Sequence, residues 1–231
     1  MRSGRAAGNV GLASGPRFAE TLAAMIDMSF RVLVDELAAK TPTPGGGAAA
    51  ALTACMGAAL VQMVLRFSRG RKGNEAREAA LAGAEELLQD HLQRLLPTAE
   101  RDCRSFDLVS AAYKMPKETE AQQAIRQRAI EEAMVGAMVV PEELLCMVRD
   151  VFRAVSGVVD AVPKNIISDL ASGAALLGAA ADGALLNVRI NAAYLKNRDL
   201  AGKAVDRVRG VRQEIQAQQS AITAAVEKLL A

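Results

Sequence analysis

Apolar side chains recur at helical spacing along most of the chain, which predicts a bundle of helices. In the first helical segment, about residues 18–39, they follow the i, i+3, i+4, i+7 pattern at Phe30, Leu33, Val34 and Leu37. Alanine and leucine dominate the apolar positions, aromatic residues make up only 3% of the chain, and β-branched and aromatic residues form few clusters. The sequence therefore predicts an all-α protein.

Residues 47–68 are predicted to form a long helix at the centre of the bundle. Its first 18 residues carry no charge, which also fits a membrane span. Thr53 and Gln62 interrupt the stretch, and we identify no second span of similar length and apolarity. We therefore favour a buried central helix, with a membrane-associated protein as the alternative. A neighbouring helix is expected to approach closely along the small residues Ala50, Ala54, Gly57 and Ala58.

The other helices are amphipathic and are separated by proline, glycine or capping residues. They are predicted from Asn74 to Leu96, from Pro97 to Tyr113, from about Glu120, from Asn165 as N-cap, and from Leu200 onwards. Pro141 is expected to kink the segment that starts near Glu120 or to begin a new helix. The last helix has an apolar seam with a polar gap at Gln218 and Gln219, which suits packing along the bundle or against a second subunit.

Composition narrows the class of protein. The chain has 231 residues, which is the length of one ordinary domain, so we expect one helical domain at 17–231 preceded by a flexible extension at 1–16. A net charge of +2 and the lack of basic runs argue against nucleic-acid binding. Three scattered cysteines indicate small buried thiols in a reducing compartment, hence the cytoplasm. The single histidine, His91, is expected on an exposed face, and it excludes a multi-histidine metal site.

The stretch Thr41–Gly47 is the first candidate for a functional site. Pro42 and Pro44 stiffen it, and Gly45, Gly46 and Gly47 permit close backbone approach, including at positive φ. It leads into a helix N-terminus, which suits a carboxylate, a phosphate or a polarised carbonyl. No Gly-Lys-Ser/Thr follows, so it is not a P-loop. The alternative is a helix-to-helix turn with glycines for packing.

Two further patterns carry polar or charged candidates. Asp169 and Asn187 are 18 residues apart, which is five helical turns, so they share a face with Asn191 one turn further on. Arg71 and Lys72 follow the central helix, where they act either as a solvated helix cap or as a basic grip for an acidic ligand.

Five blocks of sequence, from about residue 30 to residue 191, together resemble the cyclodeaminase/cyclohydrolase family of tetrahydrofolate enzymes. The blocks are Asp35-Glu36-Leu37-Ala38 with Pro42–Gly47; Gly57–Val61 with Met63-Val64; Asp102 with Phe106-Asp107 and Ala112–Thr119; Asn165 with Ile167-Ser168-Asp169; and Ala184–Val188 with Asn191.

The resemblance implies a homodimeric helical bundle that binds tetrahydrofolate in a groove near the subunit interface. It implies chemistry at the 5- and 10-nitrogens: ring-closing deamination of 5-formiminotetrahydrofolate, as in histidine degradation, or hydrolysis of 5,10-methenyltetrahydrofolate. Both reactions pass through a cationic, amidinium-like centre and need a proton transfer. No metal and no permanently bound cofactor are expected.

The same resemblance implies the site residues. We expect Asp169 to stabilise the cation and relay the proton, with Asp102 as second candidate, so Asp169→Asn should lower turnover by about 10²-fold or more. Arg71 and Lys72 are expected to bind the anionic folate tail. The other expected substrate-binding residues are Thr43, Gly45, Gly46, Gly47, Tyr113, Asn165, Ser168, Asn187 and Asn191.

Two departures from the family pattern bear on function. Gly70-Arg71-Lys72-Gly73-Asn74 stands where the family typically has Gly-Lys-Lys-Lys-Tyr, and Val162-Pro163 replaces a Gly-Asn pair. They leave open a drifted, non-catalytic paralogue that serves as a folate-binding or dimerisation module. The sequence also leaves open which of the two reactions dominates.

Overall fold

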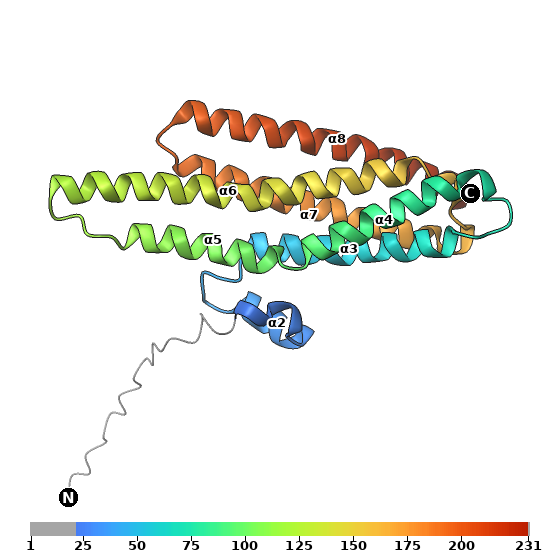
Figure 1. Cartoon of the computed structure of the whole chain (residues 1–231), viewed down its shortest axis with the longest axis horizontal. Helices are drawn as coiled ribbons and strands as arrows, with labels where there is room; N and C mark the ends of the chain where they lie inside the picture. The colour runs from blue at the N-terminus through green and yellow to red at the C-terminus, as the bar shows by residue number, and fades with distance from the viewer. Residues whose placement is uncertain (1–21, 231) are drawn as a thin grey trace, which may run out of the picture.

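The computed structural model describes residues 22–230, and these residues form helices without any strand. The bundle in Figure 1 consists of α3 (Gly46–Ser68), α4 (Glu78–Leu95), α5 (Thr98–Tyr113), α6 (Glu120–Ser156), α7 (Ile167–Tyr194) and α8 (Arg198–Leu230). Short 3-10 turns lie at η2 (Glu75–Arg77), η3 (Val159–Ala161) and η4 (Lys164–Ile166). The all-α prediction is confirmed, and the predicted extension at 1–16 lies outside the described residues.

The predicted central helix, α3, packs against α7 over most of its length. The two helices run antiparallel, because Gly46 lies beside Asn187 and Gly57 lies beside Gly173. A Cβ on Gly57 would come within 2.9 Å of the carbonyl oxygen of Gly173. The expected close approach along the small residues is therefore confirmed, and glycine is needed at this crossing because backbone meets backbone.

We expect Gly173→Val to destabilise the fold by about 1–3 kcal/mol, as overpacking typically does. Even the Cβ would lie 2.8 Å from Val61 Cγ2, and neither helix can move away without opening the core. Urea unfolding measures the effect. Gly83→Val in α4 is the matched control, because a Cβ there meets no atom within 4 Å. Equal losses in the two variants would mean that helix propensity, and not packing, sets the cost.

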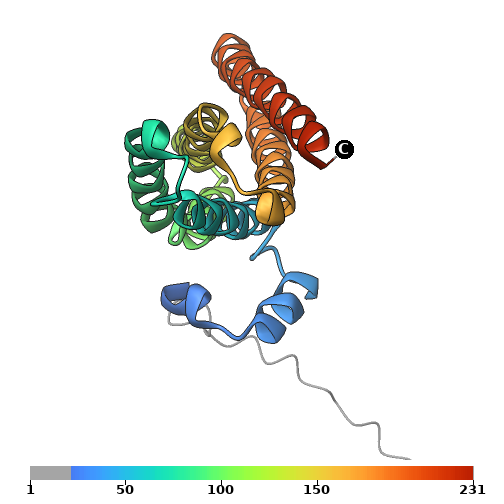
Figure 2. The same ribbon diagram turned by 90° about the vertical axis from the view of Figure 1, so that its right-hand side faces the viewer.

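The first helical segment differs from the prediction. It is divided into η1 (Leu22–Asp27) and α2 (Phe30–Ala38), because Ser29 caps α2 by accepting a hydrogen bond from the Val32 amide. The buried Met25 ties η1 to the bundle, and its amide donates to Glu100 Oε1 at 3.1 Å. In contrast, α2 has no buried residue and lies outside the bundle, below it in Figures 1 and 2.

Two helix boundaries show how local chemistry decides where helices begin. Thr119 and Gln122 form a capping box at the start of α6, as the restart near Glu120 predicted. Pro141 begins no new helix, because α6 continues through it to Ser156. The predicted N-cap at Asn165 is wrong: a 3-10 turn delays the start of α7 to Ile167, which leaves Asn165 exposed.

The C-terminal helix α8 packs along α6 and α7, as its apolar seam predicted. The polar gap in the seam lies inside this contact. Gln219 donates to the carbonyl oxygen of Ala174 at 3.2 Å, and a side chain at Gly178 would overlap the Gln219 amide. Arg212 pairs with Asp182 at 2.6 Å across the same two helices. Gln219 is therefore a hydrogen-bonded part of the α7–α8 interface, whereas the buried Oε1 of Gln218 has no hydrogen-bond partner among the described residues.

Two helices are long and apolar enough to cross a membrane by length and composition: α3 and the stretch Lys164–Tyr194 containing α7. The expectation that only one segment has this character is wrong, because alanines and glycines make α7 nearly as apolar. Of the 18 most apolar consecutive residues in each, 56% are buried in α3 and 44% are buried in the stretch that contains α7. Their apolarity serves their packing against each other at the centre of the bundle.

Candidate active site

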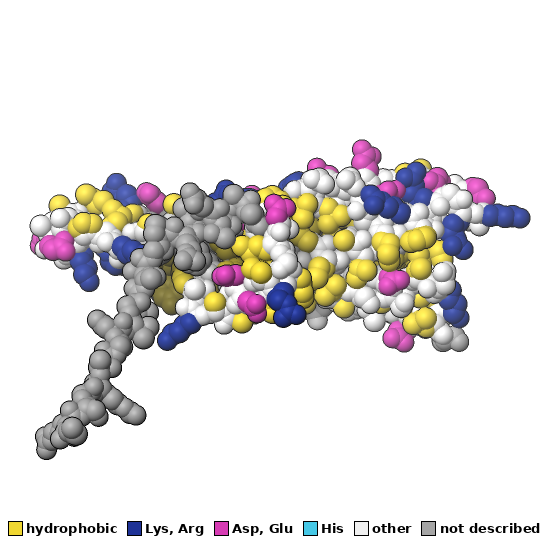
Figure 3. Space-filling model, turned by 90° about the horizontal axis from the view of Figure 1, so that it is seen from below, with side chains coloured by type: hydrophobic (Ala, Val, Ile, Leu, Met, Phe, Trp, Pro, Cys, Tyr) yellow, Lys and Arg dark blue, Asp and Glu magenta, His cyan; other side chains and the backbone are white. Residues whose placement is uncertain are grey.

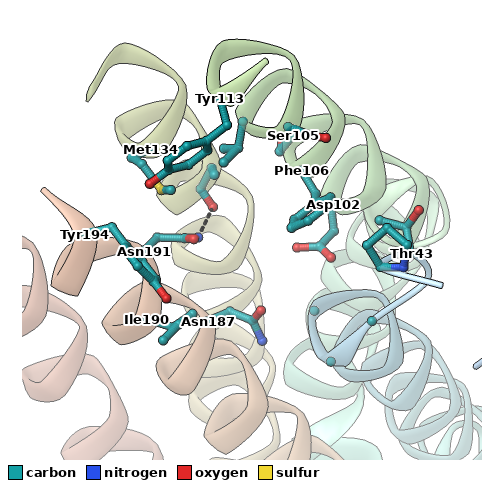
Figure 4. Close-up of a pocket in the computed structure, with 17 residues that line it drawn as sticks. Thr43, Asp102, Ser105, Phe106, Tyr113, Met134, Asn187, Ile190, Asn191 and Tyr194 are labelled. Atoms are coloured by element: carbon teal, nitrogen blue, oxygen red, sulfur yellow. Dashed lines mark hydrogen bonds between the residues drawn. The ribbon is translucent and has the colours of Figure 1, made fainter. Parts of the chain in front are cut away.

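A cavity of about 660 Å³ opens where four helices meet, at the N-terminus of α3 and the C-terminal part of α7 (Figure 4). This volume lies within the range of small-molecule binding pockets. One wall comes from α5 and another from α6. The lining residues are Pro42, Thr43, Gly45, Gly46, Gly47, Asp102, Ser105, Phe106, Val109, Ser110, Tyr113, Met134, Ala137, Asn187, Ile190, Asn191 and Tyr194.

Asp102 is the one charged residue among those that line the cavity. Its carboxylate lies against Gly47 in the first turn of α3, where a Cβ would overlap it. Burial raises the pKa of Asp102, and the backbone N–H of Ala48 acts in the opposite direction. A carboxyl group with a raised pKa, half-buried in a pocket, is suited to donate and accept a proton near neutral pH.

The glycine loop Gly45–Gly47 does not use the positive φ angles that its sequence permits. Positive φ occurs at Gly70 and Gly73 among the described glycines, and not in Gly45–Gly47. The loop needs glycine instead for the close approach of Asp102 to Gly47. The helix N-terminus that suits an anion therefore faces a carboxylate of the protein itself.

The face of α5 that borders the cavity was only partly anticipated. Asp102, Phe106, Val109 and Tyr113 follow one another at helical spacing on one side of α5. The sequence assigned roles to Asp102 and Tyr113 alone, although this spacing could have added the two residues between them. Met134 of α6 and Ile190 and Tyr194 of α7 were missed as well (Figure 4). The spacing of Ile190 and Tyr194 from Asn187 and Asn191 could have added these two, whereas no pattern in the sequence pointed to Met134.

Asn187 and Asn191 supply the polar groups on the α7 side. Asn187 donates to the carbonyl oxygen of Gly183, and Asn191 donates to that of Ala137 in α6 at 3.1 Å. These bonds occupy amide hydrogens of both residues and hold the side chains at the cavity wall. Ile190 and Tyr194, each more than half exposed, lie on the same side of α7 (Figure 4).

Five of the expected site residues lie elsewhere. Asp169 is half-buried in the first turn of α7, about 27 Å along that helix from Asn187. Asn165 and Ser168 are exposed next to it. Arg71 and Lys72 are exposed after the C-terminus of α3, also remote from the cavity. Asp169 and Asn187 do share a face of α7, but they lie near opposite ends of that helix.

The departures near Arg71 have structural roles. Asn74 donates hydrogen bonds to the carbonyl oxygens of Ser68, at 2.7 Å, and of Ala161, at 2.9 Å. It thereby ties the end of α3 to the segment that precedes α7. Gly73 has φ +96°, which only glycine adopts easily. Gly73 and Asn74, which stand where the family typically has Lys-Tyr, therefore stabilise the turn after α3.

His91 is buried in α4 rather than exposed, because α4 turns it toward α6. Its Nε2 lies 3.8 Å from Asp150 Oδ2, and the residue is 7% exposed. His91 is not among the residues that line the cavity.

The three cysteines are free thiols, and only Cys103 is buried, whereas Cys55 and Cys146 are half-buried. Burial raises the pKa of Cys103 to about 12 and that of Cys55 to about 11, so both thiols are protonated at neutral pH. Within residues 22–230, no group of three or more metal-ligating side chains comes together.

The chain was compared with known proteins. The formiminotransferase-cyclodeaminase family model matches residues 29–210. A methenyltetrahydrofolate cyclohydrolase of Methylorubrum extorquens is 36% identical over 80% of this chain and 89% of its own. The formimidoyltransferase-cyclodeaminase of Rattus norvegicus is 28% identical over 88% of this chain but only 38% of its own length. A formiminotetrahydrofolate cyclodeaminase structure from Thermotoga maritima superposes with a TM-score of 0.78 over 88% of this chain and 98% of its own, at 24% identity.

The chain thus has the helical fold found in the Thermotoga maritima protein. The family match covers most of the chain and includes every residue of the cavity. The chain belongs to the formiminotransferase-cyclodeaminase family, and the resemblance drawn from its motifs is confirmed.

Proposed function

We propose that the protein is a tetrahydrofolate one-carbon enzyme that acts at the 5- and 10-nitrogens, with hydrolysis of 5,10-methenyltetrahydrofolate as its main reaction. The observation that carries the proposal is Asp102, a half-buried carboxyl group of raised pKa in a largely apolar cavity. Hydrolysis takes precedence because the chain matches 89% of a methenyltetrahydrofolate cyclohydrolase at 36% identity. Deamination of 5-formiminotetrahydrofolate is the second candidate, supported by the name of the structural neighbour.

In the proposed hydrolysis, water adds to the methenyl carbon and Asp102 accepts a proton from it. The bond between that carbon and the 5-nitrogen then breaks, Asp102 returns the proton to this nitrogen, and 10-formyltetrahydrofolate is released with one proton to solvent. The ionised form of Asp102 also stabilises the cationic ground state, whereas its protonated form assists the leaving nitrogen. A carboxyl group whose pKa is raised toward neutrality can supply both forms.

The remaining lining residues bind the substrate in this proposal. Phe106, Tyr113 and Tyr194 provide apolar and aromatic surface for the planar rings of the folate. The side chain oxygens of Asn187 and Asn191 accept hydrogen bonds from the pterin, since their amide groups already donate within the protein. No metal and no bound cofactor takes part.

Two assays test the proposal and separate its two reactions. The loss of the methenyltetrahydrofolate chromophore measures hydrolysis, and ammonia release from 5-formiminotetrahydrofolate measures deamination. Catalysed hydrolysis above the spontaneous rate is the expected result. Ammonia release without hydrolysis would assign the second reaction and the predicted role in histidine degradation. A protein that binds folate but catalyses neither reaction would be the non-catalytic paralogue.

We also propose that two copies associate through the side of the bundle that carries α2. Phe30 on α2 is 71% exposed, and α3 and α7 expose Met56 and Leu186. Figure 3 shows hydrophobic surface along this side of the molecule. A twofold axis across the antiparallel α3–α7 pair would turn the end carrying Asp169 of one copy toward the cavity of the other. The free thiols support a cytoplasmic location, and the net charge of +2 speaks against nucleic acid as a partner.

Purified mixed dimers test this arrangement. We expect Asp102→Asn and Asp169→Asn each to reduce turnover in its homodimer. A heterodimer of the two variants, isolated through two different tags, should regain about half of the wild-type rate because one of its two sites is intact. An inactive heterodimer would show that Asp169 does not complete the partner subunit's site, and a fully active Asp169→Asn homodimer would show that Asp169 takes no part in the site. A monomer in sedimentation would contradict the dimer itself.

A further inference from the structure

Arg126 lies beside Tyr113, the cavity residue nearest the end of α5. Its Nη2 and Nε donate to the backbone carbonyl oxygen of Tyr113 at 3.0 and 3.3 Å. Its guanidinium carbon is 5.6 Å from the centroid of the Tyr113 ring, which is a cation–π distance. The side chain comes from α6 and is held by α5, so the hairpin of these two helices fixes its position.

The charge of Arg126 is not neutralised within the described part of the chain. It makes no ion pair there, and its Nη1 group makes no hydrogen bond. The arginines of α5 differ in this respect. Arg101 pairs with Glu143 at 2.7 Å, and Arg104 lies 3.9 Å from Glu100. Arg126 therefore keeps a fixed guanidinium with donors to spare.

Arg126 does not itself line the cavity, but Tyr113, which it contacts, lies at a defined distance from Asp102. Asp102 and Tyr113 are 11 residues apart on one face of α5, which is three turns or about 16 Å. Phe106 and Val109 line the cavity between them. A ligand along this wall meets a carboxyl group at one end, apolar surface in the middle and a cation beside the other end. The fitting ligand is a cationic or proton-exchanging ring joined to an anionic group through a flat apolar spacer.

We propose that Arg126 binds the anionic end of the substrate, which for a tetrahydrofolate is its glutamate carboxylate, and so fixes the one-carbon unit at Asp102. This inference rests on the proposed function. It moves the tail site away from Arg71 and Lys72, which lie at the far end of α3. The competing explanation is that Arg126 only caps α5, because it binds the carbonyl oxygen of the last residue in that helix.

Substrates with and without the glutamate separate the two explanations. The variants are Arg126→Gln and Arg126→Lys, assayed on methenyltetrahydrofolate and on methenyltetrahydropteroate, which lacks the glutamate. For Arg126→Gln we expect kcat/KM on the folate to fall by about 10-fold or more through KM, as for loss of a charge-assisted hydrogen bond. Its kcat/KM on the pteroate should equal that of the wild type. Arg126→Lys should retain part of the preference for the folate.

Arg128→Gln is the matched control, because Arg128 is exposed two residues further on α6 and lines a different groove. It should leave both substrates unaffected. Equal losses on both substrates for Arg126→Gln would show a helix cap only. An unchanged preference for the folate in Arg126→Gln would also overturn the inference. So would a complete loss of that preference when the charges of Arg71 and Lys72 are removed instead.

A binding measurement keeps this test separate from the proposed reaction. If the wild type turns over neither substrate, the proposed function fails. Calorimetric binding of tetrahydrofolate and tetrahydropteroate to the wild type and to Arg126→Gln then decides the inference. A preference for the folate that disappears in the variant supports it, and a preference that persists, or no preference in the wild type, refutes it.

Discussion

Asp102→Asn should lower turnover by about 10²- to 10⁴-fold, the scale of lost proton-transfer catalysis. The amide keeps the shape of the carboxyl group beside Gly47 but can neither accept the proton from water nor return it. Because the change removes a group needed in the transition state, kcat should fall more than substrate affinity. Steady-state kinetics on methenyltetrahydrofolate measure this. A variant with wild-type kcat would remove Asp102 from the mechanism.

The same variant should be at least as stable as the wild type, and the difference should depend on pH. Folding raises the pKa of Asp102, so the folded protein holds this proton more tightly than the unfolded chain does. The wild type therefore loses stability as the pH rises through the folded pKa, whereas the variant carries no such cost. Thermal unfolding measured from acidic to neutral pH should show the stability of the variant rising relative to that of the wild type as the pH increases. If Asp102→Asn were more stable than the wild type only at low pH, this would contradict a raised pKa of Asp102.

Gly47→Ala is the second change with a large expected effect. The added methyl group would overlap the Asp102 carboxylate, which must then leave its place at the first turn of α3. A displacement on the order of 1 Å can cost about 10²-fold in rate, so we expect a loss of this size in kcat. Alanine favours helix, and the helix itself should persist.

Gly83→Ala serves as control for Gly47→Ala, because a Cβ on Gly83 meets no atom within 4 Å. It should leave turnover unchanged. The double variant with Asp102→Asn adds a further check. If Gly47→Ala acts by displacing Asp102, it should cost little more once the carboxylate is gone. Fully additive losses would indicate a separate role for Gly47.

Local physical chemistry determined the helices. Periodicity and caps predicted α3 within one residue of its observed start, and Thr119 marked the start of α6. The small residues of α3 predicted a close helix contact, because lack of side chain volume can be read without knowing the partner. These features depend on neighbours within a few residues. The start of α7 was wrong because a 3-10 turn and an α-helix satisfy the same local preferences there.

The candidate site depended on contacts between distant segments. Helical periodicity states which face a residue occupies, but not which end of the helix meets another element. Antiparallel packing of α3 and α7 therefore placed Asn187 beside the glycine loop and left Asp169 at the other end. Arg126 has no motif around it and gains its position only through Tyr113 of the neighbouring helix. The sequence by itself determined the helices, their faces and the family, whereas the tertiary structure decided which carboxylate lines the cavity and which cation contacts Tyr113 in its wall.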